Sequence, residues 1–146
     1  MEVLQVDLAS LRDYMFFIYM LDKYLSTLEK ELKHRDYNTD VRFRIINALI
    51  NNRSFDLDRS MTVIELANVV DRAKSSISRI AVELASRGLI SRRQVLLRCG
   101  GMGFAYYIDP RDIINTIRRL KTRLLQYIET LNTYENEIRR MFKIDA

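Results

Sequence analysis

The chain has 146 residues, a formal net charge of +5 and a pI near 9.5. This length is typical of one domain with an added arm, and the basic balance suits a polyanionic partner. A single cysteine, Cys99, excludes an intrachain disulfide framework and fits a reducing compartment. The first residues lack the features of a signal peptide, and the longest apolar run, residues 14–21, is far shorter than the ~20 residues of a membrane span. We therefore expect a cytoplasmic, nucleoid-associated protein without membrane contact.

Positive charge is concentrated in the middle of the sequence. Residues 1–40 contain five Lys or Arg against eight Asp or Glu, so the N-terminal part is acidic. Residues 72–98 contain seven Lys or Arg and only one acid, Glu83. This asymmetry predicts that a polyanion binds to the middle of the chain.

One long helix is predicted at the N-terminus. Residues 3–33 contain neither Gly nor Pro, and apolar residues recur at helical spacing. Between Tyr14 and Leu21 the pattern is apolar on every side, which is typical of a helix that is buried all round. Its aromatic residues are expected to pack in a core, with a ligand pocket at a dimer interface as the alternative; they are Tyr14, Phe16, Phe17, Tyr19 and Tyr24.

Three shorter helices follow, and the third has polar residues in its first turns. A polar segment that contains His34 ends the first helix, and we expect the His34 side chain at the surface. Thr39 or Asp40 is then placed to cap a helix at residues 41–53. In "MTVIELANVV", Thr62 and Glu65 have the spacing of a capping box, which predicts a helix start. A tight connection leads to "KSSISRIAVELASRG", where apolar residues again recur at helical spacing.

A β-hairpin is predicted next. Its strands are expected at residues 90–98 and 104–108, the second of which is rich in aromatic residues. Glycines between the strands supply the positive φ angles of a hairpin tip, and they are Gly100, Gly101 and Gly103. Cys99 borders this turn, where a lone thiol usually packs against its neighbours and otherwise serves as a redox handle between subunits.

The last predicted helix spans residues 111–142 and resembles a coiled-coil strand. Apolar residues follow one another by alternating steps of four and three over about four heptads. We expect this seam to join two copies of the chain, with pairing to the N-terminal helix of the same chain as the alternative and the orientation left open. The predicted dimer interface consists of Leu11, Met15, Ile18, Ile117, Leu120, Leu124, Tyr127, Leu131, Tyr134 and Ile138.

Helix, tight turn, helix and hairpin, in this order, predict a winged helix-turn-helix. In that arrangement the second helix enters the major groove of DNA with its N-terminal residues against base edges. Arg79 is then placed for a bidentate contact with guanine, and the hairpin arginines suit phosphates or a neighbouring minor groove. The alternative is a helix start beside solvated arginines. The predicted DNA contacts are Lys74, Ser75, Ser76, Ser78, Arg79, Arg92, Arg93 and Arg98.

Residues 61–143 resemble the winged-helix transcriptional regulators of the TrmB-like and MarR-like groups, which are common in archaea. The resemblance lies in "IELANVVDRAKSSISRIAVELASRGLISRR" and in "GGMGFAYYIDPRDII", which is similar to the wing and following helix of TrmB-like proteins. It implies a recognition helix that carries the four residues from Ser75 to Arg79 named above and a wing that carries the three arginines. Two positions depart from the pattern: Ala73 replaces a capping Ser or Thr, and Met102 replaces an Arg of the wing. The sugar-binding domain of TrmB proteins has no counterpart here, so sugar sensing is not implied.

The sequence thus predicts a mainly α fold with a small β-hairpin wing: a winged helix-turn-helix flanked by long N- and C-terminal helices. We expect a dimerisation arm at residues 1–36, a DNA-binding domain at 37–110 and a dimerising coiled coil at 111–146. The predicted function is sequence-specific, homodimeric regulation of transcription on double-stranded DNA, with repression as the default. A protein-docking module and a sequence-tolerant nucleoid protein are the alternatives. The sequence contains one histidine, one cysteine and no clustered carboxylates, so we expect neither an enzyme nor a metal or cofactor site. The sequence does not identify an effector.

Overall fold

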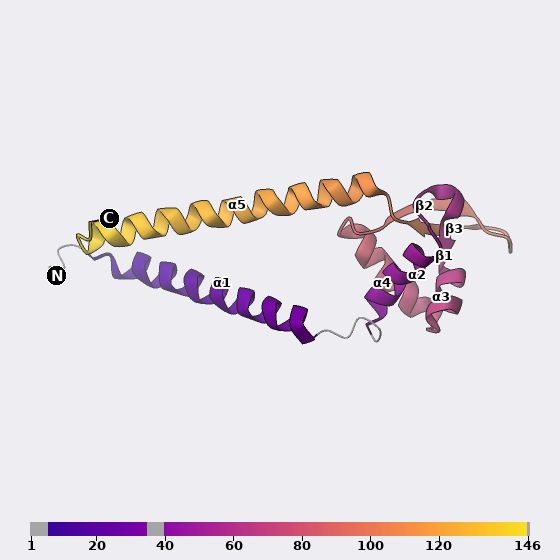
Figure 1. Cartoon of the computed structure of the whole chain (residues 1–146), viewed down its shortest axis with the longest axis horizontal. Helices are drawn as coiled ribbons and strands as arrows, with labels where there is room; N and C mark the ends of the chain where they lie inside the picture. Colours follow the sequence, from indigo (N-terminus) through magenta and orange to yellow (C-terminus); the bar gives the residue numbers. More distant parts are fainter. Residues whose placement is uncertain (1–5, 35–39, 146) are drawn as a thin grey trace. The chain divides into compact units, whose positions relative to one another are not determined.

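The computed structural model describes residues 6–34 and 40–145, which form two compact units. Residues 6–34 and 121–145 make up the arm unit, and residues 40–120 make up the winged-helix unit. In chain order the elements are α1 (Leu8–His34), α2 (Val41–Asn51), a short 3-10 helix η1 (Leu57–Arg59), β1 (Met61–Thr62), α3 (Val63–Val70), α4 (Lys74–Ser86), β2 (Ser91–Leu96), β3 (Met102–Tyr107) and α5 (Pro110–Met141) (Figure 1). The predicted fold class, a mainly helical winged helix-turn-helix with a small β-hairpin, is confirmed.

Side-chain caps fix where the helices begin. α1 begins at Leu8, later than the predicted residue 3, because the Asp7 carboxylate accepts the backbone N–H of Ser10 at 3.2 Å. At α2, the Asp40 carboxylate accepts the backbone N–H of Arg42 at 2.9 Å, in agreement with one of the two predicted caps. The other, Thr39, lies outside the described residues, as does the side chain of His34.

Helix α3 begins with the capping box that the sequence predicts. The Thr62 hydroxyl accepts the backbone N–H of Glu65, and the Glu65 carboxylate accepts the backbone N–H of Thr62. At the other end, Asp71 adopts a left-handed conformation with φ of 60° and ends the helix. α3 is therefore confined to a short segment, and the tight turn to α4 follows directly.

The core of the winged-helix unit forms where α2, α3, α4 and the sheet meet. α4 contributes its inner face to this core, so that its opposite face is directed outward. Tyr106 anchors the central strand in the same core. The buried members are Ile45, Ala48, Leu49, Met61, Leu66, Ala67, Val70, Ile77, Ala81, Leu84, Ile90 and Tyr106.

The sheet has the order β1-β3-β2 with antiparallel pairing throughout. Strands β2 and β3 make the predicted hairpin, with bounds shifted to 91–96 and 102–107 from the expected 90–98 and 104–108. Strand β1 was not predicted, because two residues are too few to show an alternating pattern. Its pairing of Met61 with Tyr106 attaches the start of α3 to the wing.

Glycines shape the tip of the hairpin. Gly100 and Gly101 have φ of 87° and 77°, and the backbone N–H of Gly100 donates to the Leu97 carbonyl at 3.0 Å. The expected positive φ at Gly103 is wrong, because Gly103 lies within β3. The same turn leaves Cys99 exposed at the tip. The expectation that Cys99 packs against its neighbours is therefore wrong, because the turn projects it away from the core.

In the arm unit, α1 packs against the C-terminal part of α5 of the same chain. The rings of Tyr14 and Tyr134 stack with centroids 4.3 Å apart, and Phe17 meets Tyr134 edge-on at 5.4 Å and Tyr127 at 6.1 Å. Pairing within one chain, which the sequence analysis ranked second, is thus present. Joining of two copies stays a prediction.

Much of the apolar surface of the arm remains uncovered. Phe16, Tyr19 and Tyr24 are exposed in a single chain, so burial of α1 on every side stays a prediction that requires a second copy. Of the predicted interface, Leu11, Leu131, Tyr134 and Ile138 are half-buried by the pairing within the chain. The others are exposed and are Met15, Ile18, Ile117, Leu120, Leu124 and Tyr127. Among the described residues, no helix is long and apolar enough to cross a membrane.

Candidate nucleic-acid interface

The first turn of α4 has free backbone donors. Ala73 occupies the N-cap position and has no side-chain acceptor, as the sequence indicated. Its carbonyl accepts the backbone N–H of Ile77 at 3.1 Å, which leaves the N–H groups of the first turn without partners inside the helix. Together with the helix dipole, such groups favour a phosphate.

The outward face of α4 carries most of the predicted contacts. Lys74, Ser75 and Arg79 are exposed, whereas Ser76 and Ser78 are half-buried. Ser75 and Arg79 are one turn apart, so that a hydroxyl and a guanidinium lie on the same face. Such short and long polar side chains together match the reach needed for base edges in a major groove.

Val82 is a member of this face that the sequence analysis missed. It lies three residues after Arg79 and seven after Ser75, and 38% of it is exposed. An exposed apolar side chain on such a face is of the kind that contacts thymine methyl groups in major grooves. Its helical spacing from Ser75 and Arg79 was the signal that could have identified it.

The wing carries its arginines on both faces. Arg92 and Arg93 are neighbours on β2 and therefore point to opposite sides of the sheet. The Arg92 guanidinium lies over the Phe104 ring, 4.3 Å from its centroid, which fixes the direction of its charge. Phe104 was not predicted as part of the site. Arg98 is exposed in the turn at the hairpin tip.

One cleft brings the first turns of α4 and the wing together. It has a volume of about 490 Å³ and lies between the first turns of α4, the start of α3 and one face of the hairpin. Lys74, Ser75 and Ser78 line it from α4, and Arg92 and Phe104 line it from the wing. The structure therefore joins four of the predicted contacts at one cleft. Ser76, Arg79, Arg93 and Arg98 are not among its lining residues.

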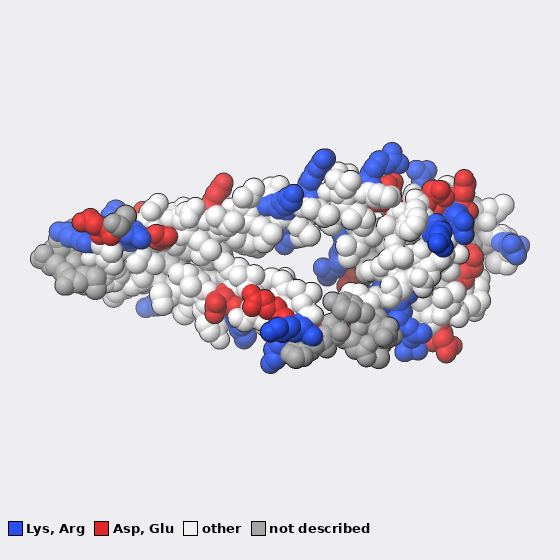
Figure 2. Space-filling model, in the orientation of Figure 1, with Lys and Arg blue, Asp and Glu red and all other residues white. Residues whose placement is uncertain are grey.

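The basic side chains that were predicted to contact DNA are not neutralised by acidic neighbours in the parts of the chain that the structure describes. Within residues 6–34 and 40–145, none of the five forms an ion pair with an acid; they are Lys74, Arg79, Arg92, Arg93 and Arg98. By contrast, Arg87 and Arg111 are paired with Glu83 and Asp109. On the face drawn in Figure 2, basic side chains of the winged-helix unit alternate with acidic ones. The charge available to a polyanion thus comes from particular unpaired residues.

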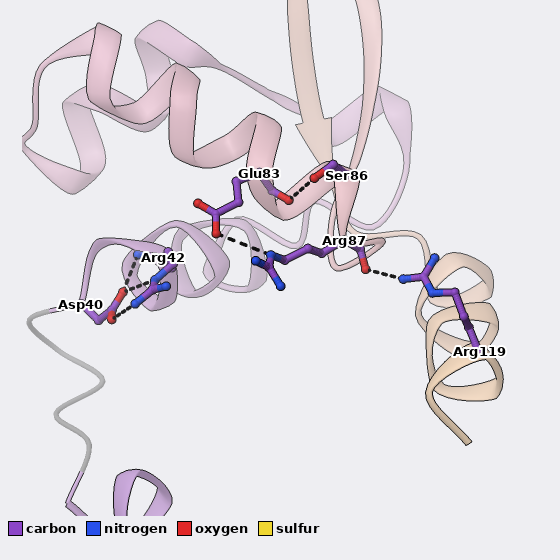
Figure 3. A network of polar contacts seen from close by, with 6 residues as sticks. All are labelled: Asp40, Arg42, Glu83, Ser86, Arg87 and Arg119. Carbon is purple, nitrogen blue, oxygen red and sulfur yellow. Dashed lines mark hydrogen bonds and ion pairs between the residues drawn. The ribbon is translucent and has the colours of Figure 1, made fainter. Parts of the chain in front are cut away.

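The end of α4 is held by the first turns of α5. Arg119 donates from Nη2 to the Arg87 carbonyl at 3.0 Å, while the Arg87 side chain turns back to Glu83 at 3.5 Å (Figure 3). The Thr116 hydroxyl donates to the Gly88 carbonyl at 2.9 Å, and Thr116 as a whole is only 7% exposed. Side chains of α5 therefore bind the two backbone carbonyls that directly follow α4. We call Arg87, Gly88, Thr116 and Arg119 the α4–α5 joint.

Glycine is required at the centre of this joint. Gly88 has φ of 74°, a left-handed conformation, and a Cβ at this position would overlap the Thr116 hydroxyl oxygen. Nearby, the Asp109 carboxylate accepts the backbone N–H of Arg111 at 3.0 Å and pairs with its side chain. Those two contacts, the backbone bond first, lower the pKa of Asp109 and keep it anionic where α5 begins.

A second cleft of about 480 Å³ borders the joint. Its polar lining includes Ser91, Asp112, Asn115 and Arg119, and the Ser91 hydroxyl donates to the Asp112 carboxylate. In the part of the chain that the structure describes, no three side chains of His, Cys, Asp or Glu gather in a way that could hold a metal ion.

Comparison with known proteins gives only distant similarities. No protein-family model matches the chain, and no curated protein matches its sequence. Among solved structures, it is similar to a possible transcriptional regulator from Methanosarcina mazei, with 20% identity over 63% of this chain and 78% of that one and a TM-score of 0.44. A MarR family transcriptional regulator from Silicibacter pomeroyi has 17% identity over 92% and 96% of the two chains, with a TM-score of 0.38. The heme sensor protein PefR from Streptococcus agalactiae has 15% identity over 93% and 97%, with a TM-score of 0.39. At these scores, the similarities do not establish a shared function.

Proposed function

We propose that the protein is a sequence-specific regulator of transcription that binds double-stranded DNA as a homodimer. The observation that carries this proposal is the shared cleft, at which the uncapped first turn of α4 and the wing present Lys74, Ser75, Ser78 and Arg92 together. None of these residues is needed for the core, and the cations among them have no acidic partner in the described parts of the chain. A surface with this composition fits phosphates and base edges in neighbouring grooves.

The residues of this surface divide into two roles. Arg79 and Val82, on the outward face of α4, read base edges through a guanidinium and an apolar contact. Lys74, the first-turn N–H groups and the wing arginines bind phosphates and set the position of the helix in the groove. Affinity then depends on salt through the second group, whereas sequence preference depends on the first.

The homodimer follows from the uncovered apolar residues of the arm. Exposed Leu, Ile, Met and aromatic side chains along α1 and α5 exceed what a lone soluble arm normally leaves in water. Two copies joined there present two recognition helices to half-sites about 34–36 Å apart on a pseudo-palindrome. Occlusion of a promoter is the simplest mode of action for such a dimer.

A protein-docking module is the second candidate, because the same exposed arm would also suit another protein. Unpaired arginines on α4 and the wing favour DNA, since a module that docks through the arm has no use for them in the winged-helix unit. The two functions respond differently to Arg79→Ala combined with Arg92→Ala: DNA binding is lost, but docking through the arm is retained.

Separate substitutions of Arg79 and Arg93 test the division of roles. Arg79→Ala is expected to cost ~1–3 kcal/mol on the preferred sequence and to broaden the set of sequences bound. Arg93→Ala should weaken binding to all duplexes and lower the slope of log affinity against log salt by about 1. The measurement is fluorescence anisotropy on a duplex selected from a random pool, with a scrambled duplex beside it.

Arg123→Ala is the matched control, because it removes the same charge from an exposed helix position in the arm unit. It should leave affinity, preference and salt slope close to those of the parent. If Arg79→Ala and Arg93→Ala reduce binding to every sequence equally, the assignment of Arg79 to base readout is wrong.

A further inference from the structure

The hairpin tip carries an exposed apolar pair. Leu96 and Met102 lie directly opposite each other in the β2–β3 register. Leu96 is 76% exposed and Met102 is 56% exposed, although each has a large apolar side chain. Neither belongs to the core of the winged-helix unit. An exposed apolar pair at the end of a two-stranded ribbon calls for a binding partner.

The tip holds this pair in a fixed arrangement. The backbone N–H of Leu97 donates to the Gly101 carbonyl at 2.9 Å, which closes the turn beyond the pair. The Leu97 side chain folds over Gly103, where a Cβ would come within 2.8 Å of Leu97 Cδ1. Leu97 therefore packs across the hairpin and stiffens it, while Leu96 and Met102 remain outside.

Two arginines flank the pair along the hairpin, and an acid nearby is Glu65 of α3, which lines a cleft together with Leu96 and Arg98. By strand alternation, Leu96 shares a face of the hairpin with Arg92, and Arg98 lies two residues further on, in the turn. The same face continues through Phe104 into the cleft that contains the first turns of α4. A partner that contacts both the arginines and the apolar tip must carry negative charge at its surface and an apolar region in the groove below it. Because the face is continuous with the cleft, the same partner also touches α4.

Duplex DNA has this chemistry, since its phosphates line a groove whose floor is made of stacked, flat bases. A second copy of this basic hairpin would bring arginines against arginines, which is unfavourable. An apolar protein partner would gain nothing from Arg92 and Arg98. The continuity of this face with the DNA-contacting end of α4 thus favours the groove next to the one that α4 enters.

We propose that Leu96 and Met102 form an apolar wedge that enters the minor groove beside each half-site, partly unstacks one base step and bends the duplex. This proposal rests on the proposed function and adds to it a mode of DNA deformation. Leu and Met are among the side chains that proteins insert between base steps, with kinks of ~20–90°. Pyrimidine–purine steps such as TA and CA unstack most easily, so the wedge selects them at the flank of the half-site without hydrogen bonds.

The test compares the shape of bound DNA for three versions of the full chain. The probe is a duplex selected from a random pool by the parent protein, labelled at both ends for energy transfer and carrying 2-aminopurine at the flanking step. The variant is Leu96→Ser with Met102→Ser. Leu57→Ser is the control, because it removes a 41% exposed leucine from η1, which lies outside the hairpin.

The parent and the control should bend the duplex and raise the 2-aminopurine fluorescence. The double variant should still bind, with an unchanged salt slope, but leave the duplex straight and the fluorescence low. A second selection with the double variant should no longer enrich pyrimidine–purine steps at the flank. Equal bending by parent and double variant, or no bending by the parent, would overturn the wedge while leaving DNA binding intact. Absence of binding by the parent to any duplex would appear in the titration itself and would reject the proposed function.

Discussion

Substitution of Gly88 by alanine is expected to lower the free energy of unfolding by ~2–4 kcal/mol. A left-handed conformation costs an L-residue about 1–2 kcal/mol, and the new methyl group must also displace the buried Thr116 hydroxyl. Displacement of Thr116 removes its hydrogen bond to the Gly88 carbonyl and loosens the α4–α5 joint. Urea denaturation followed by far-UV circular dichroism measures the loss.

Gly100→Ala is the matched control for this prediction. Gly100 also has a positive φ, 87°, but a Cβ there would meet nothing within 4 Å. Its substitution should therefore cost only the backbone strain, about 1–2 kcal/mol. In a Thr116→Ala background, where the obstructing hydroxyl is absent, Gly88→Ala should become as mild as Gly100→Ala. Equal losses for Gly88→Ala and Gly100→Ala in the parent chain would show that the joint is not close-packed.

If the protein is the proposed homodimer, replacement of Leu124 and Ile128 by glutamate is expected to convert it into a monomer. Both side chains are more than half exposed on α5 in a single chain, and they lie one turn apart. Each would contribute ~1.5–3 kcal/mol when buried between two copies, and a glutamate there instead brings an unpaired charge into the interface. Light scattering at micromolar concentration measures the mass of each variant.

Asn132→Glu serves as the control, since Asn132 is an exposed polar residue on the same helix. This variant should remain dimeric. Leu131→Glu should behave differently again and lower the helix content, because Leu131 is half-buried by the pairing within the chain. A parent protein that scatters as a monomer would contradict the dimer.

Features that depend on neighbouring residues were predictable from the sequence. The capping box of Thr62 and Glu65 forms as expected because both partners lie within one turn. The missing cap at Ala73 and the glycine turn of the hairpin are equally local. These features place the start of α4 and the tip of the hairpin, which border the candidate site.

Contacts between distant segments were not predictable in the same way. Thr116 and Gly88 are 28 residues apart, and no periodicity connects them. Similarly, the apolar seam of α5 indicates a partner helix but does not specify whether the same chain or a second copy provides it. In the structure, Tyr134 stacks on Tyr14 of its own chain. Leu96 and Met102 are exposed because the tip of the hairpin extends beyond the core. The alternation of residue types along a strand does not show where a hairpin extends beyond the core.

The most direct test of sequence-specific DNA binding is an anisotropy titration of the parent protein with duplex DNA over a salt series. One duplex comes from upstream of the protein's own gene, and the other is a pool of random sequences. A specific regulator should bind the upstream duplex tightly at moderate salt and the pool weakly, with a steep loss as salt rises. Failure to bind either duplex at low salt would contradict DNA recognition by α4 and the wing and would favour the docking module.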